Sequence, residues 1–317
     1  MSDERPSQSL AALAPIGDSS AGEVAIELRE VSKRFGQVQA LQQISFTIPH
    51  GQIVAILGPN GSGKTTAISL MLGLRRPTAG QVRLFGHNPR NRHVRARCGV
   101  MLQESGVPFA LTVRELIALF RSYYPHPLPI DRVLAMADLP RQASLAAGLL
   151  SGGQRQRLYF ALAICGDPDV LFLDEPTAAL DIEMRQAFWH QIRDFVREGK
   201  TIVLTTHYLE EADALADRIM ILNHGRILAD DSPGVLKAQV AQRRVSFDVE
   251  AALTPDIFAD LPVYSLEIAQ SHVALLTPKP EAVMRHLFNQ GINLNNLEVV
   301  GAGLEEAFIT LTQQKAS

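Results

Sequence analysis

A glycine-rich stretch, Gly58-Pro-Asn-Gly-Ser-Gly-Lys-Thr65, constrains the fold of this chain more than any other feature. It follows the apolar run IVAIL and precedes KTTAISLMLGL, which has the composition of a helix. Glycines let backbone N–H groups converge on phosphate oxygens, and the following helix presents its positive N-terminal end. Lys64 can reach the β- and γ-phosphates of a nucleotide, and the Thr65 hydroxyl can ligate Mg²⁺. The stretch therefore predicts a strand, a phosphate-binding loop and a helix, with phosphate contacts from Gly58, Pro59, Asn60, Gly61, Ser62, Gly63, Lys64, Thr65 and Thr66.

Two adjacent carboxylates, Asp174 and Glu175, end a second apolar run, VLFLDE. A hydrophobic strand that delivers a carboxylate beside a phosphate loop suits a Mg²⁺ partner. The neighbouring carboxylate can orient the attacking water or take a proton from it. By itself, an apolar run followed by two acids also fits a strand that ends in solvated side chains. The phosphate loop favours the functional interpretation, with Asp174 on the metal and Glu175 as the base.

Apolar runs alternate with helical patterns through the first three quarters of the chain. VAIELREVSKRF and ISFTIP favour strands, and TIVLTTH favours a buried one. DIEMRQAFWHQIRDFVREG predicts an amphipathic helix that ends at Gly199. RIMILNHGRILADD predicts a hairpin that turns at His224-Gly225. Buried strands between helices indicate an α/β fold with a mostly parallel core sheet covered on both faces.

The two ends of the chain differ in character from this middle part. Residues 1–23 are rich in Ser, Ala, Pro and Gly, so we expect a disordered leader. Residues 24–238 form the main predicted domain, with a helical subdomain at about 104–166. Residues 239–317 contain the short strand patterns VSFDVE, YSLEIA and HVALLT and the helix patterns PEAVMRHLFNQG and GLEEAFITLT. They predict a small C-terminal α+β domain.

Composition excludes several classes of protein. The net charge is −3 over 317 residues, without the basic excess of a nucleic-acid binder, so no nucleic-acid partner is expected. The two cysteines, Cys98 and Cys165, have no metal-type spacing and favour a reducing compartment. No run approaches about 18 apolar residues, and the N-terminal stretch lacks the pattern of a secretory signal. A membrane role would therefore need a separate membrane chain.

Between the two phosphate-site motifs stands Leu150-Ser-Gly-Gly-Gln154, which resembles the signature motif of the ABC ATPases. The rest of that family's motifs follow in order over residues 24–235. Gln103 resembles the Q-loop glutamine, and Ala178–Asp181, which reads AALD, resembles the D-loop. His207 resembles the switch histidine, and Phe35 resembles the aromatic residue that stacks on adenine. Ala178 replaces the usual Ser, and Phe35 the commoner Tyr, while the charged residues of the site are all present.

The resemblance implies a fold, cofactors and partners. The fold would be a P-loop NTPase of the ABC ATPase type, with an antiparallel β subdomain and a helical subdomain. ATP and Mg²⁺ would be bound, with Lys64, Gln103, Glu175 and His207 in catalysis and Thr65, Gln103 and Asp174 on the metal. Because the family forms head-to-tail dimers, a further set of residues would meet the ATP held by a second subunit. They are Ser151, Gly152, Gly153, Gln154 and Asp181. The chain would be a homodimer or pair with a related ATPase, and would act peripherally on an integral-membrane permease at the cytoplasmic face of the inner membrane.

The kind of ABC protein is left open among three interpretations. The ending GLEEAFITLT resembles the LEE-x-F-x-x-LT ending of drug-resistance-type exporter ATPases and favours export. Alternatively, the C-terminal domain would regulate an importer. A non-transport ABC ATPase is the third possibility, although the chain has neither two ATPase domains nor long coiled coils.

Some further residues have simpler interpretations. Arg90, Arg92, Arg95 and Arg97 are expected on a solvated face that leads into a strand, with a nucleic-acid or lipid-headgroup patch as the alternative. Trp189 and Cys165 are expected in the core. Glu210 and Glu211, in the acid-rich YLEEADALAD, are expected to be exposed helix charges.

Overall fold

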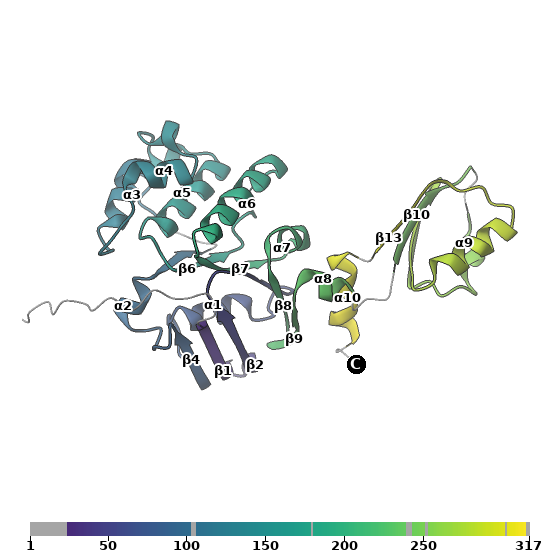
Figure 1. Cartoon of the computed structure of the whole chain (residues 1–317), viewed down its shortest axis with the longest axis horizontal. Helices are drawn as coiled ribbons and strands as arrows, with labels where there is room; N and C mark the ends of the chain where they lie inside the picture. The colour runs from purple at the N-terminus through teal and green to yellow at the C-terminus, as the bar shows by residue number, and fades with distance from the viewer. Residues whose placement is uncertain are drawn as a thin grey trace, which may run out of the picture.

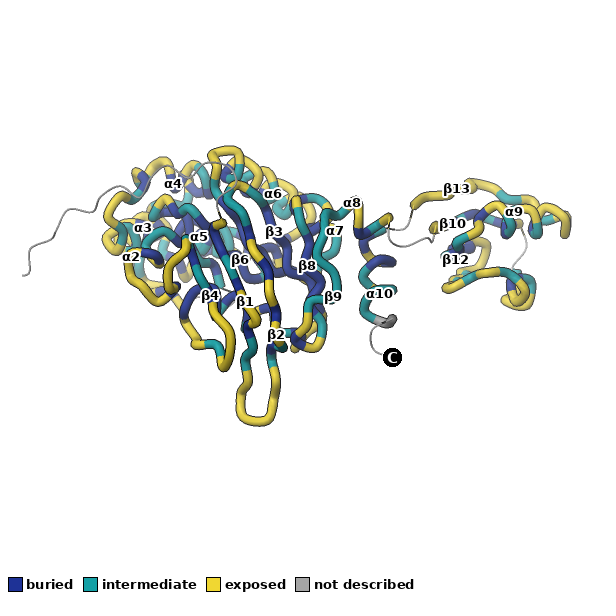
Figure 2. The backbone as a smooth tube through the Cα atoms, turned by 60° about the horizontal axis from the view of Figure 1, so that its bottom comes forward, coloured by how far each residue is buried: buried dark blue, intermediate teal, exposed yellow. Residues whose placement is uncertain are grey.

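The computed structural model describes residues 24–102, 106–178, 180–238, 243–250, 253–301 and 303–314. A six-stranded sheet forms the centre of the main body, in the order β5-β6-β7-β3-β8-β9, and only β9 runs antiparallel to its neighbour. Its strands are buried along their length in the middle of the sheet (Figure 2). They are β3 (Ile53–Leu57), β5 (Cys98–Met101), β6 (Val170–Asp174), β7 (Thr201–Thr206), β8 (Arg218–Asn223) and β9 (Arg226–Asp231). The predicted mostly parallel sheet is confirmed.

The two faces of this sheet bury two separate hydrophobic clusters, because successive side chains of a strand point to opposite faces. Ile53, Ala55 and Leu57 of β3 face one cluster, which also contains side chains of α5 (Gly152–Ile164), α6 (Ile182–Arg197) and α7 (Leu209–Leu215). Val54 and Ile56 face the other, which contains α1 (Lys64–Met71). Both faces of the sheet are covered, as the apolar runs predict (Figure 1).

A three-stranded antiparallel sheet, β2-β1-β4, packs on the α1 side. Its strands are β1 (Val24–Phe35), β2 (Val38–Pro49) and β4 (Ala79–Leu84). The hairpin between β8 and β9 turns at His224-Gly225, where both residues have positive φ, 45° and 74°. Two such residues are typical of the tight turn that matches strand twist, so the predicted hairpin is confirmed.

Helices dominate the segment between β5 and β6. They are α3 (Val113–Arg121), α4 (Ile130–Met136) and α5, with the short turns η1 (Pro140–Gln142) and η2 (Ala147–Leu149). The Thr112 hydroxyl accepts a hydrogen bond from Glu115 N, and the Glu115 carboxylate accepts from Thr112 N, so α3 begins in a capping box. The basic segment ahead of β5 forms α2 (Arg92–Arg95) and leads into that strand, as expected.

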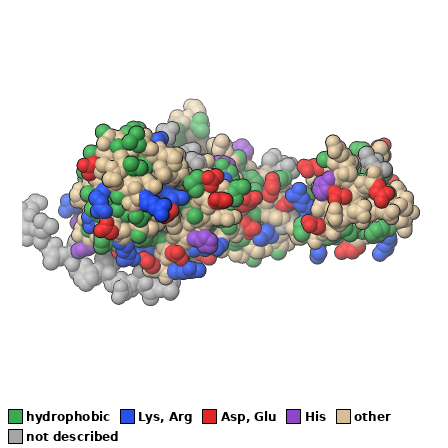
Figure 3. All heavy atoms as spheres, turned by 90° about the horizontal axis from the view of Figure 1, so that it is seen from above, with side chains coloured by type: hydrophobic (Ala, Val, Ile, Leu, Met, Phe, Trp, Pro, Cys, Tyr) green, Lys and Arg blue, Asp and Glu red, His purple; other side chains and the backbone are tan. Residues whose placement is uncertain are grey.

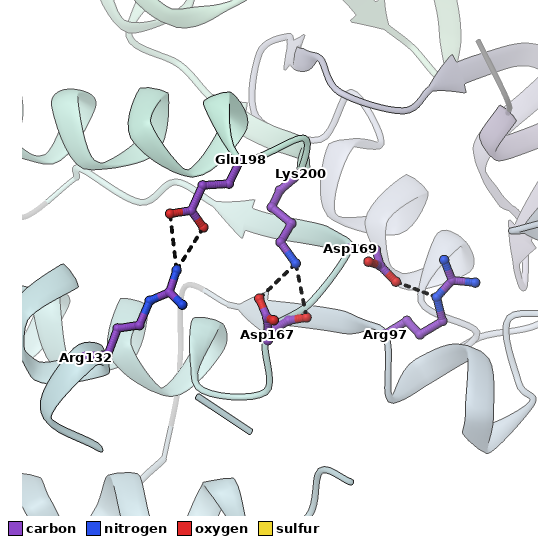
Figure 4. Close-up of polar contacts among 6 residues, drawn as sticks. All are labelled: Arg97, Arg132, Asp167, Asp169, Glu198 and Lys200. Atoms are coloured by element: carbon purple, nitrogen blue, oxygen red, sulfur yellow. Dashed lines mark hydrogen bonds and ion pairs between the residues drawn. The ribbon is translucent and has the colours of Figure 1, made fainter. Parts of the chain in front are cut away.

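Two ion pairs join the segments that enter β5, β6 and β7, and a third joins two helices nearby (Figure 4). Arg97, just before β5, binds Asp169, just before β6. Lys200, just before β7, lies 2.8 Å from Asp167. Arg132 of α4 lies 3.2 Å from Glu198 at the end of α6. Exposed ion pairs contribute about 0–1 kcal/mol each. The three pairs lie at the edge of the sheet opposite the strand ends that carry Asp174 and His207.

The C-terminal segment forms a third, smaller hydrophobic cluster on a four-stranded antiparallel sheet, β11-β12-β10-β13. Its elements are β10 (Arg243–Asp248), η3 (Pro255–Phe258), β11 (Ser265–Ala269), β12 (His272–Thr277), α9 (Pro280–Asn289) and β13 (Asn295–Gly301). The last helix, α10 (Leu304–Gln314), instead contacts α8 (Pro233–Ala238), α7 and β9 of the main body (Figure 1).

The domain bounds 24–238 and 239–317 stay a prediction, and the predicted leader lies outside the described residues. None of the described helices is long and apolar enough to cross a membrane.

Candidate active site

A pocket of about 650 Å³ opens at the N-terminus of α1. It lies where β3, β6 and β7 end, because parallel strands deliver their C-terminal ends to one edge of the sheet. The residues that line it are Asn60, Gly61, Ser62, Gly63, Lys64, Thr65, Thr66, Glu175 and His207. The structure thus brings most of the predicted phosphate loop together with the predicted base and the predicted switch histidine.

Close packing shapes the loop itself. A side chain at Gly58 would meet Leu222 O at 2.1 Å, and one at Gly63, which has φ of 111°, would meet Ala40 O at 2.6 Å. The β8–β9 hairpin holds the loop from outside, since Gly225 N donates to Ser62 O at 3.0 Å. The buried Ser62 hydroxyl has no hydrogen-bond partner among the described residues. An unpaired polar group in a preformed loop fits a loop that completes its hydrogen bonds with a ligand.

Lys64 is held inside the loop by backbone carbonyls. Its ammonium donates to Gly58 O at 2.7 Å and to Pro59 O at 3.2 Å. Burial lowers the pKa of Lys64 from its ordinary value, and the nearby negative charges of Glu175 and Asp174 act in the opposite direction. A buried ammonium bound only to neutral acceptors favours an anionic ligand, because a phosphate gives it a stronger partner than a carbonyl.

Oxygen groups gather around Asp174 at the end of β6. The Thr65 hydroxyl donates to Asp174 Oδ2 at 3.4 Å, and the Thr205 hydroxyl of β7 donates to Oδ1. A carboxylate and a hydroxyl beside a phosphate loop are the hard oxygen donors that Mg²⁺ prefers. The donor set therefore fits the expected metal. Thr205 is absent from the sequence predictions, although the two threonines that follow the apolar residues 202–204 are a signal for it.

Glu175 and His207 face each other across the pocket. Glu175 follows β6 with a positive φ of 51°, and its N–H donates to Thr205 O at 3.0 Å. His207 Nδ1 lies 3.2 Å from Glu175 Oε1. A non-glycine residue with positive φ needs support from its surroundings. The backbone bond to β7 provides that support and directs the carboxylate toward the phosphate loop.

A buried carboxylate behind these two residues corrects one sequence expectation. Glu210 is exposed as predicted, but Glu211 of α7 is fully buried. Its Oε1 accepts hydrogen bonds from Thr177 Oγ1 at 2.9 Å and from Trp189 Nε1 at 3.2 Å. Burial raises the pKa of Glu211, and hydrogen bonds from Thr206, Thr177 and Trp189 partly oppose that shift.

The position of Glu211 matters for the site. Thr177 stands two residues after Glu175, and α7 begins two residues after His207. Glu211 therefore ties together the segments that carry the predicted base and the predicted switch histidine. The acid-rich pattern of YLEEADALAD concealed it, because an acidic side chain in a surface helix is normally exposed. Trp189 packs against the core and Cys165 is buried, as expected.

The signature residues lie apart from this pocket within one chain. Ser151 caps α5, accepting from Gln154 N at 3.3 Å, while Gln154 Oε1 accepts from Ser151 N at 3.0 Å. Asp181 similarly caps α6, accepting from Met184 N at 2.8 Å. Ser151 and Gly152 are exposed. None of these residues lines the nucleotide pocket.

The predicted adenine contact is not among the described residues that line the pocket. Phe35 ends β1 and is 38% exposed, with Lys33 Nζ and Arg75 Cζ each 5.0 Å from its ring centroid. It is not among the residues that line the pocket, so adenine stacking on this ring stays a prediction. Gln103 lies outside the described residues.

Comparison with known proteins now gives the family. A family model described as ABC transporter matches residues 41–178. Nod factor export ATP-binding protein I of Burkholderia lata is 39% identical over 239 residues, 73% of this chain and 77% of that protein. The protein of the same name from Rhizobium sp. (strain N33) is 40% identical over 220 residues, 67% of this chain and 72% of that one.

Solved structures agree with the sequence relatives. The ATP-binding cassette MJ0796, as a dimer in a post-hydrolysis state bound to ADP and Pi, is 27% identical with a TM-score of 0.60 and covers 65% of this chain and 98% of its own. An ATP-binding subunit of an ABC transporter is 25% identical with a TM-score of 0.62, covering 68% and 92%.

This chain belongs to the family of ABC transporter ATP-binding proteins. It is an ATP-binding subunit of an ABC transporter and couples ATP hydrolysis to transport. The predicted fold class, family and ATPase activity are confirmed.

Proposed function

We propose that this chain powers export through a membrane permease on a separate chain, by closing as a dimer around two ATP molecules and opening after hydrolysis. The observation that carries the proposal is the pocket in which Lys64, Thr65, Glu175 and His207 converge. The names of the curated relatives support the direction, since they are export ATP-binding proteins. The LEE-x-F-x-x-LT ending, now placed on α10, points the same way.

Hydrolysis is assigned to residues of the pocket. Glu175 would orient the attacking water and take its proton, and His207, 3.2 Å from that carboxylate, would contact the γ-phosphate. Lys64 would exchange its bonds with Gly58 O and Pro59 O for the β- and γ-phosphates. Thr65 and Asp174 would hold Mg²⁺, which neutralises phosphate charge when bound. Gln103 is proposed as a further metal contact.

The signature residues complete the site from a second copy. Ser151, Gly152 and Gly153 stand at the start of a 13-residue helix, whose positive end favours an anion. Because they do not line their own chain's pocket, a head-to-tail pair is the arrangement that would bring them to a phosphate. A dimeric MJ0796 cassette among the solved structures supports this arrangement. Asp181 would lie at the same interface.

The permease would dock on the helical segment of the main body. Five large apolar side chains are exposed there, Phe109, Leu119, Tyr123, Leu145 and Leu149, the last at 75%. Viewed from above, hydrophobic and basic side chains lie side by side on this part of the molecule (Figure 3). Exposed apolar side chains among charged ones favour a protein interface. The chain would thus be held at the cytoplasmic face of the membrane.

Replacement of Glu175 by Gln tests the assignment of the base. Gln keeps the size of the side chain but cannot accept a proton, so we expect turnover to fall about 10²- to 10⁴-fold while ATP still binds. ATP-bound dimers should then accumulate on size-exclusion chromatography. The control is Glu183→Gln, which changes an exposed carboxylate at the start of α6. Unchanged steady-state hydrolysis in Glu175→Gln would rule out this base.

Co-purification tests the transporter assignment separately. The tagged chain is expressed at native level, membranes are solubilised in mild detergent, and the proteins that elute with the tag are identified. We expect a polytopic membrane protein. Recovery of the chain with a ribonucleoprotein, or alone from the soluble fraction, would contradict the proposal.

A further inference from the structure

A second pocket, of about 750 Å³, lies on the antiparallel side of the main body. The segment after α1, strand β4 and the turn that follows β4 form its walls. It is larger than the nucleotide pocket, about 650 Å³, and the two share no lining residue. Neither the motifs nor the proposed hydrolysis gives it a role.

Its charge is of one sign. Arg75, Arg76, Arg83 and Arg90 line it together with His87, and no Asp or Glu of the described segments is among the lining residues. None of the four arginines makes an ion pair within the described part of the chain. Glu27, the cross-strand partner of Arg83 in β1, is bound to Arg29 at 2.7 Å. Four uncompensated cations around one hollow repel one another, so their grouping favours an anionic ligand over a role in folding.

The arginine-rich stretch ahead of β5 is divided by the fold. Arg97 pairs with Asp169 and stacks on Phe85, with its guanidinium carbon 3.9 Å from the ring centroid. Arg92 and Arg95 belong to α2. Arg90 lies in the pocket with three arginines that come from other parts of the sequence. A cluster assembled through the fold differs from a run of solvated charges along one helix.

The walls of the pocket are fixed. Gly73, with φ of 67°, lies against the opposite wall, since a side chain there would meet Pro89 C at 2.7 Å. Leu84 and His87 exchange backbone hydrogen bonds of 2.8 and 3.0 Å, and Asn88 Oδ1 accepts from Arg90 N at 2.9 Å. The hollow is therefore preformed, which lowers the entropic cost of binding.

We propose that this pocket binds a phosphate-bearing anion with several negative charges. Guanidinium groups form paired hydrogen bonds with phosphate oxygens, and several of them around one hollow suit more than one phosphate oxygen. The volume falls in the range of about 300–1,000 Å³ that is typical of small-molecule sites. A free polyphosphate and the phosphate headgroup of an anionic lipid share this chemistry.

The test compares a charge-reversed pocket with a matched control. Arg76→Glu/Arg90→Glu changes two arginines of the pocket and spares Arg75, which lies over the predicted adenine contact. Arg141→Glu/Arg285→Glu makes the same change in net charge at two exposed arginines elsewhere. All proteins are saturated with ADP, so that the phosphate loop is filled. Unchanged ATP hydrolysis by both variants serves as the control for folding.

Two probes distinguish the sources of the ligand. Calorimetry measures binding of tripolyphosphate, and flotation measures binding to vesicles of phosphatidylcholine with or without phosphatidylglycerol. We expect the unmodified chain and the control to bind at least one anionic probe. The pocket variant should bind that probe at least about tenfold more weakly. Binding of tripolyphosphate assigns a soluble ligand, and binding of phosphatidylglycerol vesicles alone assigns a headgroup. Equal binding by the pocket variant, or no binding of either probe by the unmodified chain, would overturn the proposal.

Discussion

Two glycine-rich helix starts in this chain differ in what surrounds them. No side chain caps the start of α1, and the pocket there already contains Lys64 and the strand-end carboxylate of Glu175. The start of α5 is closed by its own capping box and offers only neutral, exposed groups, Ser151 and Gly152. An uncapped helix start with a cation binds a phosphate by itself, whereas a capped neutral one adds to a site built elsewhere. The difference indicates that the two ends are complementary halves of one site.

Of the changes at the two helix starts, loss of Lys64 should have the largest effect. Lys64→Ala removes the one lysine among the described residues that line the nucleotide pocket. We expect turnover to fall about 10³-fold, because a positioned cation stabilises charge that develops on the phosphates. ATPase assays at saturating ATP measure this, with Lys279→Ala on the exposed start of α9 as the control. If the activity of Lys64→Ala stayed within a few-fold of that of the unmodified chain, the start of α1 would not be the half of the site that supplies the positive charge for the phosphates.

A negative charge at the α5 end should have a smaller but selective effect. A side chain at Gly152 meets nothing within 4 Å, so Asp fits there and suits the positive end of the isolated helix. In a closed dimer the same carboxylate would face the γ-phosphate. We therefore expect Gly152→Asp to lower turnover about 10²-fold, with the affinity of the single chain for ATP and its thermal stability preserved. Gly152→Ala, which adds bulk without charge, is the matched control.

Mixing the two variants sharpens the comparison. In a head-to-tail dimer, a Lys64→Ala chain paired with a Gly152→Asp chain combines both defects in one site and leaves the other site intact. A one-to-one mixture should then regain roughly a quarter of the unmodified activity, since half of the dimers are mixed and each has one intact site. If each chain hydrolysed ATP by itself, mixing two inactive variants would restore nothing.

The same two ends show what the sequence could predict. The α1 half follows from contiguous residues, because strand, loop, Lys64 and helix are neighbours in the chain. The carboxylates of Asp174 and Glu175 could be added because apolar parallel strands end at one edge of the sheet. Contacts between residues that are far apart in the chain leave no such signal in the sequence. Glu211 is buried by Thr177 and Trp189, which come from other elements.

The C-terminal part shows the same limit. Strand β13 is exposed along its whole length and lacks the alternation that the neighbouring strands β10 and β11 show, so the sequence did not predict it. Helix α10 has a clear pattern, but its packing on α7 and α8 depends on where the chain returns after β13. The arginine pocket likewise gathers residues from three segments, of which only Arg90 belongs to the arginine-rich stretch that the sequence marks.

The smallest expected effect concerns Glu211, which links the segments that carry Glu175 and His207. Burial raises the pKa of Glu211 in the folded chain above its ordinary value of 4.5. The folded state therefore keeps this proton to a higher pH than the unfolded chain does, and its free energy of unfolding falls as pH rises above about 4.5. Glu211→Gln removes that component while an amide oxygen still accepts from Thr177 and Trp189.

We expect Glu211→Gln to stay within about 1 kcal/mol of the unmodified chain at low pH, and to become progressively more stable relative to it as pH rises. Urea unfolding between about pH 5 and pH 8 measures the difference. The control is Glu210→Gln, a neighbour whose exposed side chain has no burial cost to relieve, so its difference should not change with pH. A flat difference for Glu211→Gln would mean that position 211 is ionised in the folded chain as readily as in the unfolded one. Its hydrogen bonds with Thr177 and Trp189 would then outweigh burial, and the segments that carry Glu175 and His207 would be held by a carboxylate throughout this range.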